Sequence, residues 1–234
     1  MTWNVPFMYE TFLNTWKAVP TTLKLTFIPF LISVPFAFLL AMAQIKKVRF
    51  WSRFAQGYVS FVRGIPVVVL VLLFYNTLPG QLAAIFKFFG SSFNVYRQVP
   101  GITYAYFIFS LTAIAALTEI FRAALSAVDK GQLEAAYAIG LNAPQAYVRI
   151  IFPQAIAVAW PNLCNLLIML VKNTSLAFMM TVKDITQTAK LGAALNYCYA
   201  EAYTVILIIY VIICLILEQI FRRTERYLNR HLVK

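Results

Sequence analysis

Five long apolar runs divide this sequence of 234 residues. A transmembrane helix needs about 20 largely apolar residues to cross a hydrocarbon core about 30 Å thick. The composition agrees, because 62% of the residues are hydrophobic and only 12% are charged, about half the charged share of a soluble domain. We therefore predict an all-α transmembrane bundle of five spans that forms a single domain over residues 1–234. The predicted spans cover about residues 22–44, 58–78, 104–124, 155–171 and 203–221.

Positive charge is distributed unevenly around these runs. One side carries Lys46, Lys47, Arg49, Arg53, Arg122, Lys130, Arg149, Arg222, Arg223, Arg226, Arg230 and Lys234. The other side carries fewer, namely Lys17, Lys24, Lys87, Arg97, Lys183 and Lys190. Because Lys and Arg accumulate in cytoplasmic loops, we predict an outside N-terminus and a cytoplasmic C-terminus. The net charge of +12 then indicates contact with anionic lipid and not with nucleic acid.

Two connections face outward in this arrangement. Residues 79–103 are rich in Gly, Ser and Pro and predict a loop, with room for one short interfacial helix. Residues 172–199 have mixed polarity, so they form either a surface segment or one that dips back into the membrane. A dipping segment would need its backbone shielded by protein or water.

The cytoplasmic loop over about residues 129–153 has a more specific pattern. Gly140 suits the left-handed position that ends a helix, and Asn142 suits the N-cap of the next helix, about residues 143–151. Pro153 lies where we expect the chain to turn into the fourth span. The pattern predicts two short helices that meet at a glycine elbow, a compact projection able to transmit force to a partner.

The same loop resembles that of a known family. Glu134-Ala135-Ala136, then Gly140, Ile150 and Phe152-Pro153, resembles the EAA loop of ABC importer permeases, which usually have Leu in place of Phe152. Further stretches resemble the polar amino acid branch of type I importers, such as histidine and glutamine permeases. They are Arg63-Gly64-Ile65-Pro66, Glu119-Ile120-Phe121-Arg122-Ala123 with Gly131-Gln132, and Asn165 with Lys172-Asn173-Thr174-Ser175-Leu176. That branch commonly has Thr in place of Ile65, Asp in place of Asn173 and often Glu in place of Leu166.

This resemblance implies a mechanism and a set of partners. Two permease subunits, identical or related, would pair in the bacterial cytoplasmic (inner) membrane above two ATPase subunits. An extracellular or periplasmic binding protein would deliver the amino acid. The EAA loop would enter a groove of the ATPase, with contacts expected from Glu134, Ala135, Ala136, Gly140 and Pro153.

Nucleotide chemistry is expected elsewhere in that complex. The sequence has no phosphate-binding glycine loop with its Lys-Ser/Thr, so ATP and Mg²⁺ would be bound by the partner ATPase. We expect no catalytic residue, cofactor or metal site in this chain. Its three cysteines, which lack metal-ligand spacing, are interpreted as packing residues.

Polar residues within the predicted spans are candidates for the substrate pathway, because such groups are costly in a bilayer. The candidates are Glu119, Thr118, Arg63, Asn162 and Asn165, and more weakly Asn76. Each has an alternative role. Glu119 is three residues from Arg122 and either pairs with it or meets a substrate ammonium. Arg63 could hold a carboxylate or a lipid headgroup, and the two asparagines could instead bond neighbouring helices.

Two other functions remain to be weighed. A secondary amino acid transporter working without an ATPase would predict inverted repeats and charges near the bilayer centre, and the sequence has neither. A membrane enzyme would need a catalytic or metal motif, but the single histidine lies in the tail. Since Glu119 is the one acid among the pathway candidates, the expectation leans towards neutral or weakly polar substrates.

Overall fold

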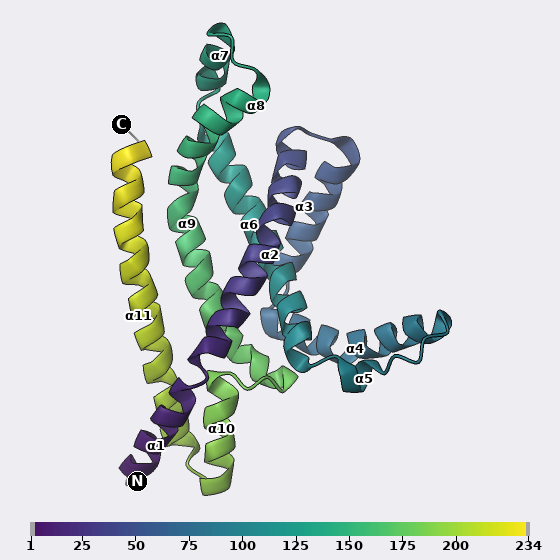
Figure 1. Ribbon diagram of the computed structural model, residues 1–234, viewed down its shortest axis with the longest axis vertical. Coiled ribbons are helices and arrows are strands. Elements are labelled where there is room, and N and C mark those ends of the chain that lie inside the picture. The colour runs from purple at the N-terminus through teal and green to yellow at the C-terminus, as the bar shows by residue number, and fades with distance from the viewer. Residues whose placement is uncertain (1–2, 233–234) are drawn as a thin grey trace.

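The computed structural model describes residues 3–232, and each regular element in that range is a helix (Figure 1). Lys234 lies outside the described residues, as does the side chain of Arg230. In chain order the elements are α1 (Val5–Trp16), α2 (Val19–Ile45), α3 (Arg49–Gly64), α4 (Val67–Phe88), α5 (Val95–Gln98), α6 (Gly101–Ala127), α7 (Lys130–Ala138), α8 (Ala143–Ala146), the π-helical turn η1 (Tyr147–Ile151), α9 (Phe152–Asn173), the 3₁₀ segment η2 (Thr174–Met180), α10 (Ile185–Asn196) and α11 (Tyr199–Leu232).

Among the described residues, five helical segments are long and apolar enough to cross a membrane. They are Val19–Ile45, Val67–Phe88, Gly101–Ala127, Ala143–Met180 and Tyr199–Leu228. The predicted all-helical class with five candidate spans is therefore confirmed. The helices α2, α6, α9 and α11 run along the long axis of the molecule and form its body (Figure 1).

Small side chains allow α2 and α6 to pack closely. Ala37 and Ala41 on α2 and Ala113 on α6 are fully buried. The hydroxyl of Ser33 on α2 donates a hydrogen bond to the Ser110 carbonyl on α6 at 3.0 Å. Small residues and hydroxyl hydrogen bonds are the usual means of joining helices in a membrane, because apolar side chains gain little by leaving lipid.

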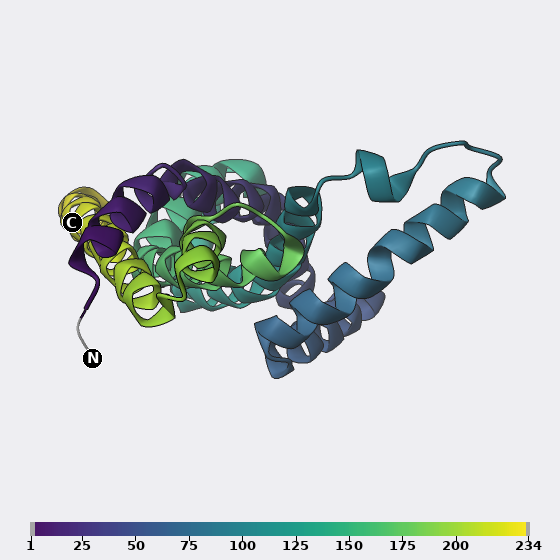
Figure 2. The ribbon, with the colours of Figure 1, turned by 90° about the horizontal axis from the view of Figure 1, so that it is seen from below.

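The second predicted span, residues 58–78, is wrong as a single helix. Ile65 and Pro66 are extended, with φ/ψ of −108°/134° and −58°/134°, so α3 ends at Gly64 and α4 begins at Val67. Proline disfavours helical backbone in the residue before it, which explains the break. α3 runs back beside α2, and α4 then leaves the body sideways (Figures 1 and 2).

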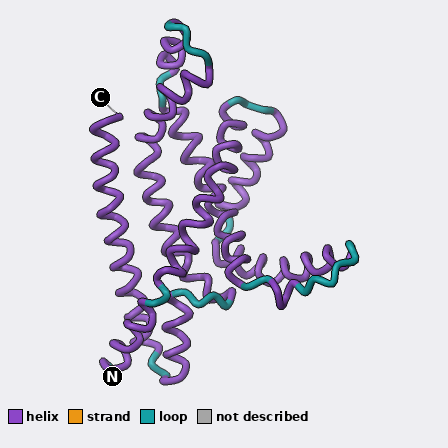
Figure 3. The backbone as a smooth tube through the Cα atoms, in the orientation of Figure 1, coloured by secondary structure: helices purple, strands orange, loops and turns teal. Residues whose placement is uncertain are grey.

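The predicted outward loop over residues 79–103 is also wrong in its first part. α4 continues through Pro79 to Phe88 before a loop and the short α5. Residues 172–199 are mostly helical as well, as η2 and α10. The helix α1, which the apolar runs do not predict, packs with α10 and α11 at the end of the body opposite α7 (Figures 1 and 3).

Candidate functional site

α7 is a nine-residue helix whose two ends are fixed by local hydrogen bonds. The Asp129 carboxylate accepts the backbone N–H of Gly131 at 2.6 Å. At the other end Gly140 has φ +81°, the N–H of Leu141 donates to the Ala136 carbonyl at 3.1 Å, and that of Gly140 donates to Tyr137 at 3.0 Å. This pair of bonds is the Schellman motif, and its left-handed residue favours glycine. The glycine elbow inferred from the sequence is therefore present.

α8 begins with a capping box. The Asn142 side chain accepts the Gln145 N–H at 3.0 Å, and the Gln145 side chain accepts the Asn142 N–H at 3.0 Å. The predicted turn at Pro153 is wrong, because the helical path continues from α8 through η1 into α9. A proline can occupy the first turn of a helix, and the π-helical turn just before Pro153 accommodates its missing N–H.

The exposed tip of this loop differs in part from the expected contact set. Glu134, Ala135 and Gly140 are exposed, as a docking surface requires. Ala136, in contrast, is 1% exposed and packs within the chain, so its side chain does not lie on the exposed surface of the tip. Pro153 lies at the start of α9 and not at the tip.

The apolar part of the tip was not predicted. Ile139 is 75% exposed, and Tyr137 and Val148 are also exposed. Ile139 stands directly before the helix-ending Gly140, so a large apolar residue at such an elbow is the sequence signal that could have identified it. Exposed apolar side chains on a projecting loop indicate a surface for a protein partner.

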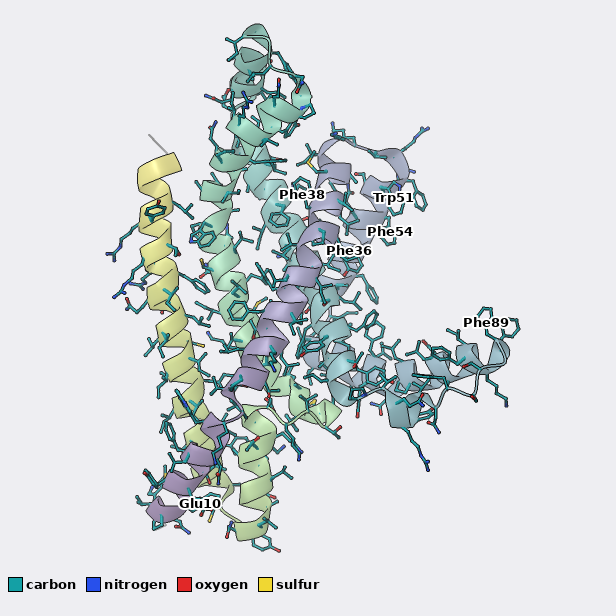
Figure 4. The ribbon with its side chains drawn as sticks, viewed as in Figure 1. Glu10, Phe36, Phe38, Trp51, Phe54 and Phe89 are labelled. Atoms are coloured by element: carbon teal, nitrogen blue, oxygen red, sulfur yellow. The ribbon has the colours of Figure 1, made fainter. Side chains whose placement is uncertain are left out.

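Aromatic side chains connect this loop to the body of the bundle. Tyr147 in η1 packs on Phe152 with ring centroids 5.7 Å apart, and Phe152 packs edge-on to Phe38 of α2 at 5.6 Å. Phe38 also meets Phe121 of α6 at 6.2 Å. Figure 4 labels Phe38 on α2, which lies beside α6 and α9. The phenylalanine at position 152 thus joins the loop to two neighbouring helices.

A cavity of about 580 Å³ separates α7 from the ends of α2 and α6. Its lining includes Lys47, Arg122, Lys130 and Glu134. Next to it the Arg122 guanidinium donates to the Glu119 carboxylate at 2.6 Å, a salt bridge within α6. Of the two roles considered for Glu119, the structure contains the ion pair.

Three other pathway candidates do not lie together. Thr118 is fully buried, and its hydroxyl donates to the Ile114 carbonyl within α6 at 2.7 Å. Arg63 is exposed in the last turn of α3, at the end of the body opposite α7 (Figure 1). Asn76 donates to the Leu72 carbonyl within α4 at 2.7 Å.

The remaining candidates share one face of α9. Asn162 and Asn165 are exposed, and so are Met169 and Lys172, at the spacing that repeats every turn of a helix. We inferred no role for Lys172 from the sequence. Its spacing from Asn162 and Asn165 nevertheless places it on the same face of α9. Amide and ammonium groups are costly against lipid tails, so this polar face of α9 (Asn162, Asn165 and Lys172) requires water or protein beside it.

Five helices long and apolar enough to span a membrane, together with a capped loop that projects from one end, are the architecture of a multi-pass membrane protein. The family described as "Binding-protein-dependent transport system inner membrane component" matches residues 33–230. The chain belongs to this family and is a multi-pass inner-membrane permease component. In such systems a separate ATPase subunit binds the nucleotide, and the permease carries no cofactor.

Relatives along almost the whole chain are amino acid permeases. The chain is 37% identical over 220 residues to the "Probable amino-acid permease protein YxeN" of Bacillus subtilis (strain 168), with 93% of each protein covered. It is 32% identical over 213 residues to the "L-cystine transport system permease protein TcyL" of the same organism, covering 91% of this chain and 86% of that protein.

Solved structures agree on the fold. A structure described as "Crystal structure of an amino acid ABC transporter with histidines" has a TM-score of 0.80 and 29% identity, covering 97% of this chain and all of that one. The MetNI methionine ABC transporter has a TM-score of 0.69 at 20% identity and supports the fold alone. The resemblance to amino acid ABC importer permeases is confirmed.

Proposed function

We propose that this chain forms, with a second permease subunit, the translocation pathway of an ABC importer for amino acids. An ATPase subunit binds the tip of α7, and a binding protein delivers substrate at the opposite end. The family match and the amino acid permeases among its relatives support this assignment.

The observation that carries the proposal is the continuity of the helical segment Ala143–Met180. Its first residues belong to the projecting loop, and its middle carries the polar face of α9. Because a helix transmits displacement along its axis, movement of the ATPase against α7 and α8 reaches the polar face. The contacts of Phe152 with Phe38 and Tyr147 spread this movement to α2.

The polar face of α9 suits the backbone groups of an amino acid. The Lys172 ammonium and the amide N–H groups of Asn162 and Asn165 can donate to a carboxylate. The amide oxygens can accept from an ammonium. One chain leaves this face uncovered, which supports a second permease subunit that closes the pathway.

The basic residues support the proposed orientation of the chain in the membrane. The turn with Lys46 and Lys47 lies at the same end of the body as α7 and the end of α11 (Figure 1). Lys and Arg favour the cytoplasmic side. The N-terminus is then outside and the C-terminus inside, which places α7 within reach of a cytoplasmic ATPase.

The test is ATP-driven uptake by proteoliposomes that contain the permease, its ATPase and its binding protein. Ile139→Asp places a charge on the exposed tip, so it should abolish ATPase binding and reduce uptake at least tenfold. Ile139→Leu, which keeps the apolar surface, should retain both.

Asn165→Leu should reduce uptake while ATPase binding is unchanged, because it alters the polar face and not the tip. Exposed Ile156 on the same helix provides the control Ile156→Leu, which should leave uptake unchanged. Uptake that needs no ATPase would instead identify a secondary transporter. Full ATPase binding by Ile139→Asp would refute the assigned tip.

A further inference from the structure

The direction of α4 conflicts with its composition. Val67–Phe88 is long and apolar enough to cross a membrane. Yet α4 runs across the long axis of the body, whereas α2, α6, α9 and α11 run along it (Figures 1 and 2). If the long axis is the membrane normal, α4 lies in the plane of the membrane.

Unlike α4, α3 runs along the long axis of the body. It descends beside α2 from the basic turn to the opposite end of the body (Figure 1). Its 16 residues span about 24 Å at 1.5 Å per residue, and two extended residues bring the length to about 30 Å, the thickness of a hydrocarbon core.

The side chains of α3 fit a crossing. Its internal charges, Arg53 and Arg63, lie near its two ends, where long side chains reach the interfaces. Phe36 of α2 and Trp51 and Phe54 of α3 line an apolar groove of about 590 Å³ between the two helices (Figure 4). The Tyr58 hydroxyl is satisfied within the body, donating to the Leu111 carbonyl at 2.7 Å.

The path of the chain requires one crossing between α2 and α6. α2 ends at the basic turn, and α6 begins at the opposite end of the body (Figure 1). α3 alone covers that distance, so α4 starts and finishes on the same side. A second crossing by α4 would place the start of α6 beside the basic turn, which contradicts the fold.

The second half of α4 is amphipathic, as an in-plane helix requires. One face has the polar or small residues Asn76, Thr77, Gly80, Gln81, Ala84 and Lys87. On the opposite face Phe74, Leu78 and Leu82 pack against the buried core of the body, and Phe86 packs on Phe93 with ring centroids 4.8 Å apart. Ile85 of this face is 50% exposed. The first half is uniformly apolar, but there Leu70 and Val71 are buried against the body.

The far end of α4 carries interfacial residues. Phe88 and Phe89 are 84% and 78% exposed, and Tyr96 of α5, whose hydroxyl lies beside Gly80 of α4, is 70% exposed. Figure 4 shows Phe89 at the tip of this arm. Lys87 and Arg97 are exposed as well. Aromatic rings with nearby Lys and Arg are typical of the boundary between acyl chains and headgroups.

We propose that α3 makes the second membrane crossing and that α4 lies in the outer membrane interface, bound to phospholipid. The exposed side chains of Ile85, Phe88 and Phe89 contact the upper acyl chains, and Lys87 and Arg97 meet headgroup phosphates. This inference rests on the orientation proposed above, with α7 in the cytoplasm. It moves the Arg63-Gly64-Ile65-Pro66 stretch from the inner to the outer side of the membrane.

Single introduced cysteines can test whether α3 or α4 makes the second membrane crossing. In an uptake-competent background without Cys164, Cys198 and Cys214, cysteine is introduced at Val48, Gly64 or Ser91, all exposed. A side chain at Gly64 meets no atom within 4 Å. A membrane-impermeant maleimide applied outside should label Gly64→Cys and Ser91→Cys, and label Val48→Cys only after permeabilisation. Protection of Gly64→Cys or of Ser91→Cys in intact cells would overturn the proposal.

Labelling of Val48→Cys from outside would show instead that the proposed orientation is wrong. Uptake by each variant, measured in parallel, separates a failed permease from a wrong topology.

Lipid contact is tested by fluorescence quenching in proteoliposomes. A bimane label at Ile85→Cys should be quenched by lipids brominated near the headgroup, and one at Gln81→Cys by aqueous iodide. Val211→Cys, on exposed α11, is the matched control and should be quenched by lipids brominated near the chain ends. If neither lipid nor iodide quenches Ile85→Cys and it cross-links to a second permease subunit, protein covers α4 and the lipid assignment is wrong.

Discussion

The two ends of this molecule are built in different ways. At the α7 end, helix boundaries are set by residues two or three positions apart, as in Asp129 with Gly131 and Asn142 with Gln145. At the opposite end local caps are also present, as in Asp184 with Gln187, but packing between segments far apart in the chain is added to them. There the start of α6 packs on the end of η2, and Asp184 is fully buried at the start of α10, which packs against α1 and α11.

The two kinds of contact differ in how much each contributes to the free energy of unfolding. A local cap contributes about 1 kcal/mol and can be replaced by several residue types. A tight contact between distant segments tolerates few substitutions, because neighbouring backbone must move to relieve a clash. Substitutions at the two ends should therefore differ in size and in how far their effects spread.

The largest effect is expected for Gly101→Ala at the start of α6. A Cβ there would collide with the Met180 carbonyl oxygen and lie 3.3 Å from the Met180 carbonyl carbon. Because the obstacle is backbone, η2 must shift. The substitution should lower the free energy of unfolding by about 3 kcal/mol. Thermal unfolding of the detergent-purified chain measures this.

Gly57→Ala in α3 is the matched control, since its Cβ would meet no atom within 4 Å. Alanine is the better helix former by about 1 kcal/mol, so this variant should be slightly more stable than the parent. Equal stability of Gly101→Ala and Gly57→Ala would show that the opposite end is no more tightly packed than α3.

A smaller effect is expected for Asp184→Asn, and it should depend on pH. The Asp184 carboxylate is fully buried, and one oxygen accepts the Gln187 N–H at 2.8 Å to cap α10. The other oxygen has no hydrogen-bond partner among residues 3–232. Burial raises the pKa of Asp184 from 3.8 to about 6, although the hydrogen bond from the Gln187 N–H opposes the shift.

The direction in which stability changes with pH follows from proton binding by Asp184. Between pH 3.8 and 6 the folded state holds this proton more tightly than the unfolded chain, so stability falls as pH rises and stays lower above pH 6. Asparagine keeps the cap without the charge. Asp184→Asn should therefore be more stable than the parent by at most about 3 kcal/mol at pH 7.5. The difference should vanish near pH 4 in thermal unfolding. A variant less stable than the parent at pH 7.5 would show that the charge is stabilised.

The contrast between the ends explains what the sequence could predict. The Gly140 elbow and the Asn142 cap depend on residues a few positions away, so local chemistry predicted them. Apolar length predicted the candidate spans, because transfer to lipid depends on composition. The break at Ile65 and Pro66 was readable in principle, since a proline disfavours helix before it.

The features that the sequence did not predict share a different cause. Ala136 and Thr118 are buried, whereas Ile139 and Lys172 are exposed, and residue type alone does not decide which side of a helix faces its neighbours. In a membrane protein apolar side chains occur on both sides, so hydrophobicity gives a weak signal. The direction of α4 depends likewise on its packing against α6 and η2.

The smallest effect is expected at the α7 end, for Asn142→Ala. The substitution removes the bond from the Gln145 N–H to the Asn142 side chain, at a cost of about 1 kcal/mol, while the backbone N–H of residue 142 can still donate to the Gln145 side chain. Because α8 continues through η1 into α9, only the first turn should fray, and the thermal midpoint should change little. Hydrogen exchange of residues 143–146 should accelerate about fivefold, the factor that corresponds to 1 kcal/mol. Asn142→Asp, which retains a capping oxygen, should exchange like the parent. Faster exchange that extends through α9 to Lys172 would show that this end is not locally determined and would break the contrast with Gly101.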